Sequence, residues 1–382
     1  MFSSFDIVST TGSYGVQIEP GLLDRTIAAP GERLFIVDEF LAKRLRDAGI
    51  DPVAIVADEH AKSLDRMTEV IVALRERRTT RNSELVAIGG GVVQDIAAFA
   101  ASIYMRGVGW TYVPTTLLSM TDSCIGGKSS INVGKYKNIV GTFHPPSAVL
   151  VDPALTHTLS AEQKAAGLIE AAKICQCRGS KVFGRYLALM PEVGADDGRF
   201  AAIIDESLRA KKWFIEVDEF DRAERLLLNF GHTFGHAVEA ATGFAVSHGI
   251  AVGLGMLAAI ELSQAMGLSS PQVPEIARFR KHIEGLVDVV EDLPAILAKV
   301  SLPALLEAFG SDKKHGRDRF AVIVMTGTAE VERRFLPRDD SSSALIQSAF
   351  QAMLDRVVQA AWRKEKPVDF QGHDEWRGRD PS

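Results

Sequence analysis

Four polar side chains recur at helical spacing inside one apolar segment: Arg225, Asn229, His232 and His236. Steps of four, three and four residues place all four on one helical face, in a segment where a helix over 226–242 is predicted. Large leucine and phenylalanine side chains flank them. Burying two imidazoles, a guanidinium and an amide among such neighbours is costly unless each group finds a partner. The pattern therefore predicts a metal ion and an anion as the partners.

Further residues suited to a divalent metal lie near this segment. A metal that polarises a hydroxyl or a carbonyl usually takes three protein ligands and leaves a position open. His232 and His236 have the i, i+4 spacing of a metal pair on one helix. His248 begins the next predicted helix, and Glu170 lies within a predicted helix over 160–177. We favour a metal site over a set of core histidines, and spacing alone leaves open whether His236 is a ligand or faces a substrate.

Cationic residues gather around the same region. The segment Asp122-Ser-Cys-Ile-Gly-Gly-Lys128 is a glycine-rich turn that ends in a lysine. Any single lysine is most simply explained as a solvated surface charge. As a group, fixed cations and backbone amides are what a phosphate or a carboxylate requires. The other candidates are Arg106, Lys137-Asn138, Lys173, Lys211-Lys212, Arg225 and Lys313-Lys314.

A glycine-rich turn near residue 90 has the form of a nucleotide-binding loop. Gly89-Gly-Gly-Val-Val-Gln-Asp95 follows a predicted strand and precedes a predicted helix over 96–104. Such glycines let a ligand approach the backbone at a helix N-terminus, which suits a pyrophosphate. A tight strand-to-helix turn without a ligand needs the same glycines. Asp38, at the end of another predicted strand, either accepts a hydrogen bond from a ribose hydroxyl or caps the next helix.

The elements that carry these residues predict two domains, as the length of 382 residues also does. Predicted strands over 33–38 and 85–89 and a helix over 61–75 indicate a parallel α/β sheet. After Pro153 helices dominate. They are predicted over 160–177, 200–216, 226–242, 248–267, 273–290 and 344–364, with a hairpin over 320–335. The fold class is α/β plus α: a Rossmann-like parallel-sheet domain over 1–155, a mostly helical domain over 156–362 and a flexible tail over 363–382.

Composition excludes several classes of partner. A net charge of −6 favours neither nucleic acid nor an anionic membrane. Neither the opening Met1–Asp6 nor any later stretch has the pattern of a signal peptide or a membrane span, so we expect a cytoplasmic protein. Three cysteines, Cys124, Cys175 and Cys177, cannot all pair, and we expect them to be structural thiols.

Taken together, the motifs resemble the sugar phosphate cyclases, and among them the 3-dehydroquinate synthases most closely. The resemblance covers roughly residues 30–330, with the motifs in the order of the family. They are Gly89-Gly-Gly-Val-x-x-Asp95, Tyr104-Met-Arg-Gly107, Val113-Pro-Thr-Thr-Leu-Leu118, Asp122-x-x-x-Gly-Gly-Lys128, Lys137-Asn138, Gly167-Leu-x-Glu170-x-x-Lys173 and Leu228-Asn-Phe-Gly-His-Thr-Phe-Gly-His236.

The resemblance implies an NAD-binding domain, a metal-binding helical domain, a cleft between them and a homodimer. Zinc or cobalt would be held by Glu170, His232 and His248. Facing the sugar phosphate substrate would be His236, Asn229, Lys128, Lys173, Lys211, Arg225, Asn138 and Lys314 of the Lys313-Lys314 pair. Arg106 would complete the phosphate site of the partner subunit. The NAD pocket would be lined by Asp38, Glu59, Lys62, Gly90, Gly91, Asp95, Thr115, Thr116 and Lys137, with Asp122 where cofactor and substrate meet.

The reaction implied by the resemblance uses NAD as a catalyst that is not consumed. A hydroxyl of a 3-deoxy-heptulosonate 7-phosphate is oxidised, phosphate is eliminated, the hydride returns, and an intramolecular aldol step closes a carbocycle. Such a chemistry needs the intermediate held in one pose, which explains the many cations.

Departures from the family pattern concern the substrate. Gln94 replaces the usual glycine, Ile250 stands where these synthases generally carry glutamate, and the segment 134–146 looks more like cyclases that act on sedoheptulose 7-phosphate in secondary metabolism. Conversely, Lys211, Arg225 and Asn229 fit the synthases, and we favour an acidic substrate because a neutral sugar would leave Arg225 without an anion. A specialised cyclase of valiolone type stays the alternative. A metal-dependent polyol dehydrogenase and a non-catalytic nucleotide-binding relative are less favoured.

Overall fold

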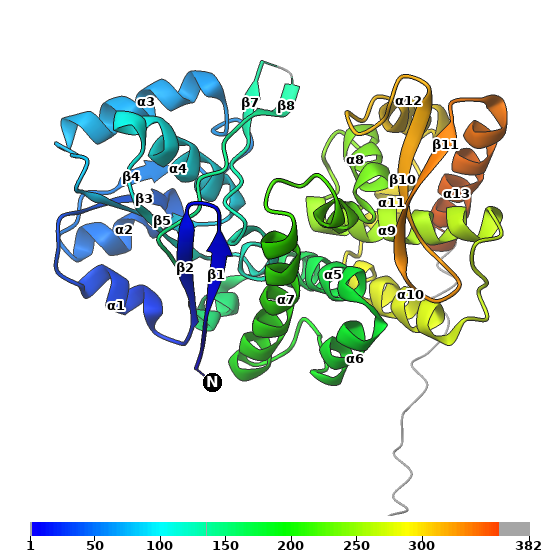
Figure 1. Ribbon diagram of the computed structural model, residues 1–382, viewed down its shortest axis with the longest axis horizontal. Helices are drawn as coiled ribbons and strands as arrows, with labels where there is room; N and C mark the ends of the chain where they lie inside the picture. Colours follow the sequence, from blue (N-terminus) through cyan, green and yellow to red (C-terminus); the bar gives the residue numbers. More distant parts are fainter. Residues whose placement is uncertain (1, 135, 359–382) are drawn as a thin grey trace, which may run out of the picture.

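The computed structural model describes residues 2–134 and 136–358, and these form a sheet-based part and a helical part (Figure 1). The predicted fold class is confirmed. The N-terminal part is built on a seven-stranded sheet in the order β1-β2-β9-β6-β5-β3-β4. All neighbouring pairs are parallel except β1 with β2. The strands are β1 (Ser3–Ser9), β2 (Gly12–Ile18), β3 (Arg33–Asp38), β4 (Val53–Ile55), β5 (Glu84–Gly89), β6 (Trp110–Pro114) and β9 (Ala148–Val151).

Helices cover both faces of this sheet. On β3, Leu34 and Ile36 pack in the large core that includes α3 (Leu64–Glu76) and α4 (Gly91–Ile103). The alternate side chains Phe35 and Val37 pack on the other face, with α1 (Leu22–Ala28) and α2 (Glu39–Asp47). Burial on both faces explains why the strand reads as a continuous apolar run. The predicted strand over 33–38 coincides with β3.

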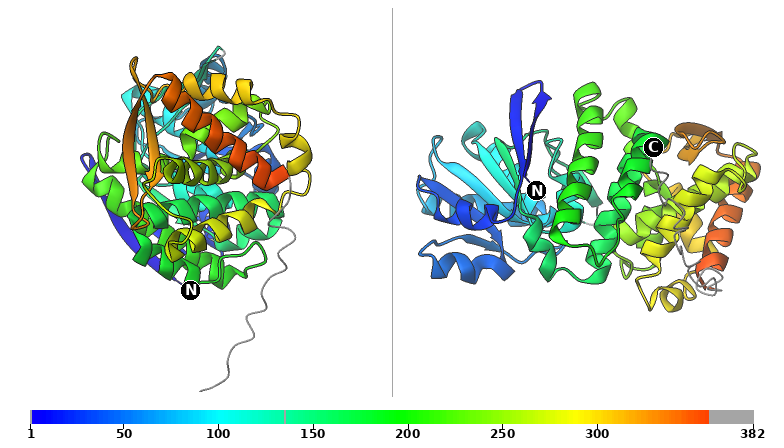
Figure 2. Two further views of the ribbon diagram at one scale, coloured as in Figure 1. Left: turned by 90° about the vertical axis from the view of Figure 1, so that its right-hand side faces the viewer. Right: turned by 90° about the horizontal axis from the view of Figure 1, so that it is seen from below.

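The β1–β2 hairpin at the sheet edge was not predicted from the sequence. It lies beside the long helix α7 (Asp197–Val217), as Figure 2 shows. The backbone amide of Val8 donates to Glu216 Oε1 at 3.0 Å, and that of Thr10 donates to Glu219 Oε2 at 2.8 Å. These carboxylates occupy donors that an edge strand otherwise leaves free.

The C-terminal part packs helices around α9 (His248–Ala265), which is buried on nearly all sides. A helix with apolar residues all round is expected in such a central position. The surrounding elements are α5 (Ala161–Arg178), α6 (Ser180–Ala188), α8 (His232–Ala241), α10 (Pro274–Val287), α11 (Leu293–Leu297), α12 (Leu302–Gly310), α13 (Asp340–Val358) and the predicted hairpin, β10 (Arg319–Met325) with β11 (Val331–Pro337). The end of the predicted last helix and the predicted tail over 363–382 lie outside the described residues. Among those described, no helix combines the length and apolar character needed to cross a bilayer.

The predicted single helix over 226–242 is wrong. The chain forms a short 3-10 helix, Glu224–Asn229, then turns at Gly231, and α8 begins at His232. Gly231 has a φ of +80°, and a Cβ there would lie 2.6 Å from the carbonyl oxygen of Val252 on α9. Contact with α9 therefore fixes a left-handed turn that only glycine adopts easily. Arg225 and Asn229 consequently do not share a helical face with the two histidines.

Two backbone contacts bring three helices of the C-terminal part together. A Cβ on Gly255 of α9 would lie 2.0 Å from the carbonyl oxygen of Gly231, at the start of α8. A Cβ on Gly249 of α9 would lie 2.6 Å from the Cα of Ala166 on α5. At both points the absence of a side chain lets the backbones touch. The helices α5, α8 and α9 are thus held at fixed separations.

The cysteines behave as the sequence indicated. All three are free thiols, and Cys124 and Cys175 are buried. Burial raises the pKa of Cys124 and of Cys177 to about 12. Thiols with so high a pKa carry almost no reactive thiolate near neutral pH, so they contribute packing.

Candidate active site

The predicted metal ligands meet where α5, α8 and α9 touch. Glu170 Oε1 lies 3.9 Å from His232 Nε2 and 3.7 Å from His248 Nε2. One ligand atom from each residue lies within 4.8 Å of the other two. Tetrahedral zinc, with bonds of about 2.0–2.2 Å, places its ligands about 3.4 Å apart. A small contraction of this group would give three ligands and leave one position open.

The environment of Glu170 favours a cation. Its side chain is fully buried, and neither carboxylate oxygen accepts a hydrogen bond from a described residue, although the Lys173 ammonium lies against one of them. Burial raises the pKa of the Glu170 carboxyl. A buried carboxylate with spare lone pairs is stabilised by a metal ion. Two imidazoles and a buried carboxylate with an oxygen left for a cation thus fit a divalent metal.

The tautomers of His232 and His236 follow from the hydrogen-bond acceptors opposite their ring nitrogens. His232 Nδ1 faces the carbonyl oxygen of Phe230 at 3.4 Å, and His236 Nδ1 faces Asp312 Oδ2 at 3.2 Å. Because an acceptor stands opposite each Nδ1, that atom carries the proton and Nε2 presents its lone pair. This assignment rests on the hydrogen-bond partners. His232 can therefore bind a metal through Nε2, and His236 can take a proton there.

Asp122 joins two of the predicted lysines. Its carboxylate lies 2.7 Å from Lys211 Nζ and 3.6 Å from Lys173 Nζ. The two ammonium groups hold the pKa of this buried carboxyl well below its usual range, outweighing burial. Lys211 also donates to the carbonyl oxygens of Asp122 at 2.6 Å and Ile125 at 3.2 Å. An ammonium has three donors, so every donor of Lys211 has a protein acceptor.

Arg225 and Lys128 form a second cationic group next to that carboxylate. Arg225 is 4% exposed, and its guanidinium donates to the carbonyl oxygen of Glu219 at 2.5 Å and more weakly to that of Gly126 at 3.4 Å. No carboxylate of a described residue lies within ion-pair distance of Arg225. Lys128 pairs with Asp221 at 2.5 Å. Arg225 therefore has donors and charge left for an anion.

Lys314 adds a third cation from the loop after α12. Its ammonium is buried and has no hydrogen-bond partner among the described residues, although Asp312 Oδ2 lies 3.7 Å away. Burial lowers its pKa. An orphaned ammonium beside His236 is suited to a phosphate or a substrate hydroxyl. Asn229, by contrast, donates to the carbonyl oxygen of Leu226 at 3.0 Å.

Three acidic residues of the site were missed by the sequence analysis: Asp221, Glu239 and Asp312. Their contacts with Lys128, His248 and His236 respectively join different elements, so the sequence does not show these pairs. The one available signal was Glu239, which follows His236 by three residues on the same helix.

The predicted nucleotide residues form two groups in the N-terminal part. Lys62 Nζ lies 2.8 Å from Asp95 Oδ2, and the amide of Ser130 donates to Asp95 Oδ1 at 2.9 Å. In the second group, Asn132 Nδ2 donates to Glu59 Oε1 at 2.7 Å, and Asn132 Oδ1 accepts from the amide of Asn138 at 2.9 Å. Lys137 lies 3.9 Å from Glu59. Asn138 is in β8 (Tyr136–Val140), which pairs with β7 (Ile131–Val133).

This hairpin links the two parts of the molecule. The carbonyl oxygen of Asn138 accepts from Lys313 Nζ at 3.0 Å. The Lys137 ammonium lies 3.5 Å from the ring centroid of Phe244, in the α8–α9 loop. Residues predicted for the cofactor and for the substrate are thus connected across the domain boundary.

The glycine-rich turn has room for a ligand. Gly90 precedes α4, and a Cβ on Gly90 would lie 2.9 Å from the Thr116 side chain. A Cβ on Gly91 would meet no atom within 4 Å. The amide of neighbouring Thr115 donates to Gly89 at 3.0 Å. Open space at the N-terminus of a helix fits a pyrophosphate.

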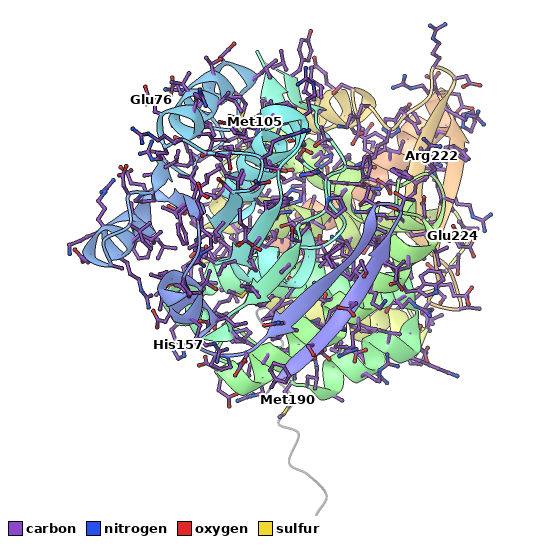
Figure 3. The ribbon with its side chains drawn as sticks, turned by 60° about the vertical axis from the view of Figure 1, so that its left-hand side comes forward. Glu76, Met105, His157, Met190, Arg222 and Glu224 are labelled. Carbon is purple, nitrogen blue, oxygen red and sulfur yellow. The ribbon has the colours of Figure 1, made fainter. Side chains whose placement is uncertain are left out.

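Two predicted residues stand apart from these groups. Asp38 accepts from the amide of Phe40 at 3.1 Å and so caps α2, the second of its two expected roles. Arg106 is exposed, has a φ of +69°, and forms no ion pair or hydrogen bond with another described residue. Figure 3 shows the neighbouring Met105 on the N-terminal part, well separated from Arg222, which precedes Arg225. Within one chain, Arg106 is not brought to the site.

Two of the departures noted in the sequence, Gln94 and Ile250, are buried. Gln94 Nε2 donates to the carbonyl oxygen of Ser123 at 2.7 Å, and Ser123 Oγ donates to Gln94 Oε1 at 2.6 Å. Gln94 therefore ties α4 to the turn that carries Asp122. Ile250 packs in the core of the helical part.

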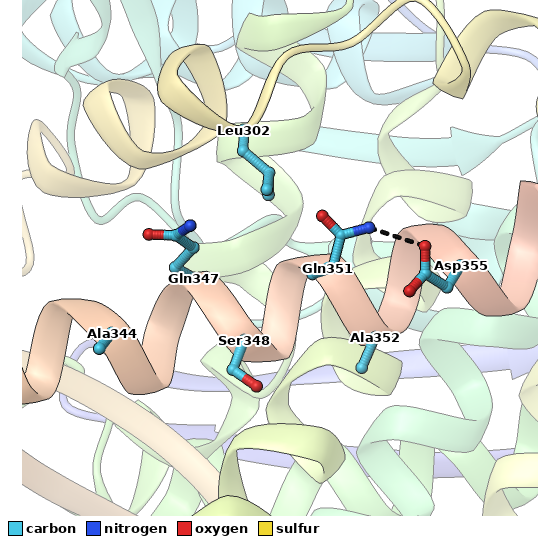
Figure 4. A pocket seen from close by; sticks show the side chains of 7 residues that line it. All are labelled: Leu302, Ala344, Gln347, Ser348, Gln351, Ala352 and Asp355. Atoms are coloured by element: carbon cyan, nitrogen blue, oxygen red, sulfur yellow. Dashed lines mark hydrogen bonds between the residues drawn. The ribbon is translucent and has the colours of Figure 1, made fainter.

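Two surface grooves lie elsewhere and contain none of the predicted site residues. One, of about 490 Å³, runs along α13 beside Leu302 (Figure 4). The other, of about 690 Å³, is lined by residues of α5, α6 and α7, including Trp213 and Arg178. The chemistry is concentrated in the charged cluster.

Most of the chain matches one family of known proteins. Residues 52–166 match the family described as 3-dehydroquinate synthase N-terminal, and residues 167–315 match 3-dehydroquinate synthase C-terminal. The chain is 38% identical over 340 residues to the 3-dehydroquinate synthase of Nitrobacter hamburgensis, which covers 84% of this chain and 87% of that protein.

Solved structures share the fold. A 2-deoxy-scyllo-inosose synthase, complexed with carbaglucose-6-phosphate, NAD⁺ and Co²⁺, gives a TM-score of 0.79 at 19% identity over 92% of this chain and 99% of that one. ValA, a 2-epi-5-epi-valiolone synthase from Streptomyces hygroscopicus subsp. jinggangensis with NAD⁺ and Zn²⁺ bound, gives 0.74 at 24% identity over 90% and 97%.

Proposed function

Because the chain belongs to the 3-dehydroquinate synthase family, we propose that it converts a 3-deoxy-heptulosonate 7-phosphate to a carbocycle with release of phosphate. It is a lyase-type cyclase. The finer proposal concerns the substrate, the cofactors and the role of each residue.

NAD and a zinc or cobalt ion are the proposed cofactors. Glu170, His232 and His248 would hold the metal, and the turn at Gly90 and Gly91 would hold the pyrophosphate of NAD. When bound, these groups supply a transient hydride acceptor and a Lewis acid at a substrate hydroxyl. The buried Glu170 carboxylate, whose Oε1 accepts no hydrogen bond from a described residue, and the open space at Gly91 support this assignment.

The other residues bind and orient the sugar. Lys128, Lys314 and Asn138 are proposed to hold the phosphate, while Lys173 and Asp122 lie beside the metal group, where a substrate hydroxyl would be placed. His236 Nε2 can take and return a proton because Asp312 keeps the other ring proton on Nδ1. Lys211 holds the Asp122 turn in this arrangement with all three of its N–H donors. Its predicted contact with a substrate carboxylate therefore requires Lys211 to break one of its bonds to Asp122.

One observation carries the choice of an acidic substrate. Arg225 is buried, and the described residues offer it no carboxylate within ion-pair distance. An unpaired guanidinium in such a place is costly, and a substrate carboxylate would relieve that cost. A neutral heptulose phosphate would not. The alternative, a cyclase acting on sedoheptulose 7-phosphate, is favoured by Gln94, Ile250 and the segment 134–146.

Phosphate release tests this proposal directly. Purified protein with NAD⁺ and zinc or cobalt is offered 3-deoxy-arabino-heptulosonate 7-phosphate and sedoheptulose 7-phosphate in separate reactions. We expect release from the acid alone, without net NADH. Release from the neutral sugar alone would establish the alternative, and net NADH from a polyol would indicate a dehydrogenase.

We also propose that the enzyme acts in the cytoplasm as a homodimer in which Arg106 serves the partner's phosphate site. Its exposure and its lack of a partner among the described residues support this role. Arg106→Ala alone should be nearly inactive. Mixed with His236→Ala, and after subunit exchange, it should recover activity because one site of each mixed dimer keeps both residues. Absence of recovery, with exchange verified by a tagged subunit, would contradict a shared site.

A further inference from the structure

Glu239 lies beside the metal group but is not one of its three ligands. It is on α8, one turn after His236, and its carboxylate Oε2 lies 3.3 Å from Nδ1 of His248 across the α8–α9 contact. The Glu239 side chain is largely buried, so this contact is not a passing surface interaction. His248 is therefore placed between two carboxylates, with Glu170 opposite Nε2 at 3.7 Å and Glu239 opposite Nδ1.

We propose that Glu239 is a positioning residue that sets the affinity of the metal site through His248. Accepting the Nδ1 proton fixes the ring tautomer and leaves the Nε2 lone pair directed at the metal position. A carboxylate behind an imidazole also makes that imidazole a stronger ligand. The proposal rests on the metal site described above, but not on the choice of substrate.

His248 needs such a partner more than His232 does. The His248 side chain is 40% exposed, whereas that of His232 is 15% exposed. His232 is held by a backbone carbonyl that the fold itself fixes. Glu239 thus orders the ligand that packing restrains least.

The same cluster could be interpreted as a second metal site. One ligand atom each from His236, Glu239 and His248 lies within 4.8 Å of the others. However, the Nδ1 atoms of His236 and His248 both face carboxylates, from Asp312 and Glu239. A second ion bound to Glu239 and His248 Nδ1 would have to displace the proton that this hydrogen bond holds. We therefore expect one metal ion per chain.

The test measures metal affinity rather than turnover. Metal-free protein is titrated with Zn²⁺ or Co²⁺ against a competing chelator, and the Co²⁺ absorption spectrum reports the coordination. Glu239→Ala should weaken binding by roughly 10- to 100-fold and alter the Co²⁺ spectrum, with one ion per chain retained. Glu239→Gln, whose amide oxygen can still accept the Nδ1 proton, should recover part of the affinity and also serves if the alanine variant does not fold.

Glu162→Ala is the matched control. Glu162 Oε1 accepts a hydrogen bond at 2.6 Å from Ser247, the residue before His248, so the control removes a carboxylate near His248 that makes no contact with its ring. Its affinity should match the wild type. Unchanged affinity in folded Glu239→Ala, an equal loss in Glu162→Ala, or loss of only a second equivalent of metal would each overturn the proposal. Failure of the wild type to bind any metal would instead overturn the metal site.

Discussion

Replacing His232 with alanine is expected to abolish metal binding and activity together. The change removes one of three ligands, and Glu170 and His248 alone cannot hold the ion at the concentration of a normal assay. Lewis-acid stabilisation by a metal is worth several kcal/mol, so phosphate release should fall by about a thousandfold or more. The measurement is metal content by elemental analysis and phosphate release on the same sample.

The matched control for this variant is His282→Ala. His282 is a partly buried imidazole of the same helical part, 3.0 Å from the hydroxyl of Tyr186 and not in the metal group. It should keep its metal, although it can lose stability. Zinc retained at one equivalent in His232→Ala would refute the assignment of His232 as a ligand.

Arg225→Ala is expected to lower kcat/KM for an acidic substrate far more than for a neutral one. Truncating one partner of a buried, hydrogen-bonded charge pair costs about 2–5 kcal/mol, which corresponds to a fall in kcat/KM of roughly 30- to several-thousand-fold. The decarboxylated analogue of the substrate makes no such pair and should lose little. Comparing kcat/KM for the acid and for this analogue isolates the carboxylate contact.

Two further variants control the Arg225 result. Arg225→Lys keeps the charge but loses the planar fork, so it should fall between the wild type and the alanine variant. Arg222→Ala removes a neighbouring arginine that stacks near Phe220 and has no proposed contact with substrate. It should leave kcat/KM unchanged. An equal loss on acid and analogue in Arg225→Ala would count against carboxylate recognition.

Much of the fold could be predicted because its signals are local. The run over 33–38 became β3 without a shift, since burial on both faces makes it apolar throughout. The residues proposed as metal ligands could also be found, because His232 has the spacing of a metal pair with His236 and His248 begins the next helix after a short turn. The β1–β2 hairpin was missed since it depends on α7, some two hundred residues away, to complete its edge.

The site was less predictable where its geometry depends on contacts between residues far apart in the sequence. The helix break at Gly231 follows from the backbone of α9, which no pattern within 226–242 reveals. Asp221 contacts Lys128, Glu239 contacts His248 and Asp312 contacts His236, and in each of these pairs the two residues come from different elements. For Lys211, the sequence indicated a cation but could not show that Asp122 and Ile125 take all three of its donors.

The glycine contacts of α9 separate positions that can be changed without loss of the metal from positions that cannot. The proposed metal ligands lie on helices whose backbones touch at Gly249 and Gly255, so almost any side chain introduced there would push the ligands apart. The residues proposed to bind the sugar phosphate, among them Lys128, Asn138, Arg225 and Lys314, lie on turns, a hairpin and a 3-10 segment. A library randomised at those loop positions should therefore yield variants with new sugar preferences that still carry metal, whereas diversity placed in α9 should yield apoprotein.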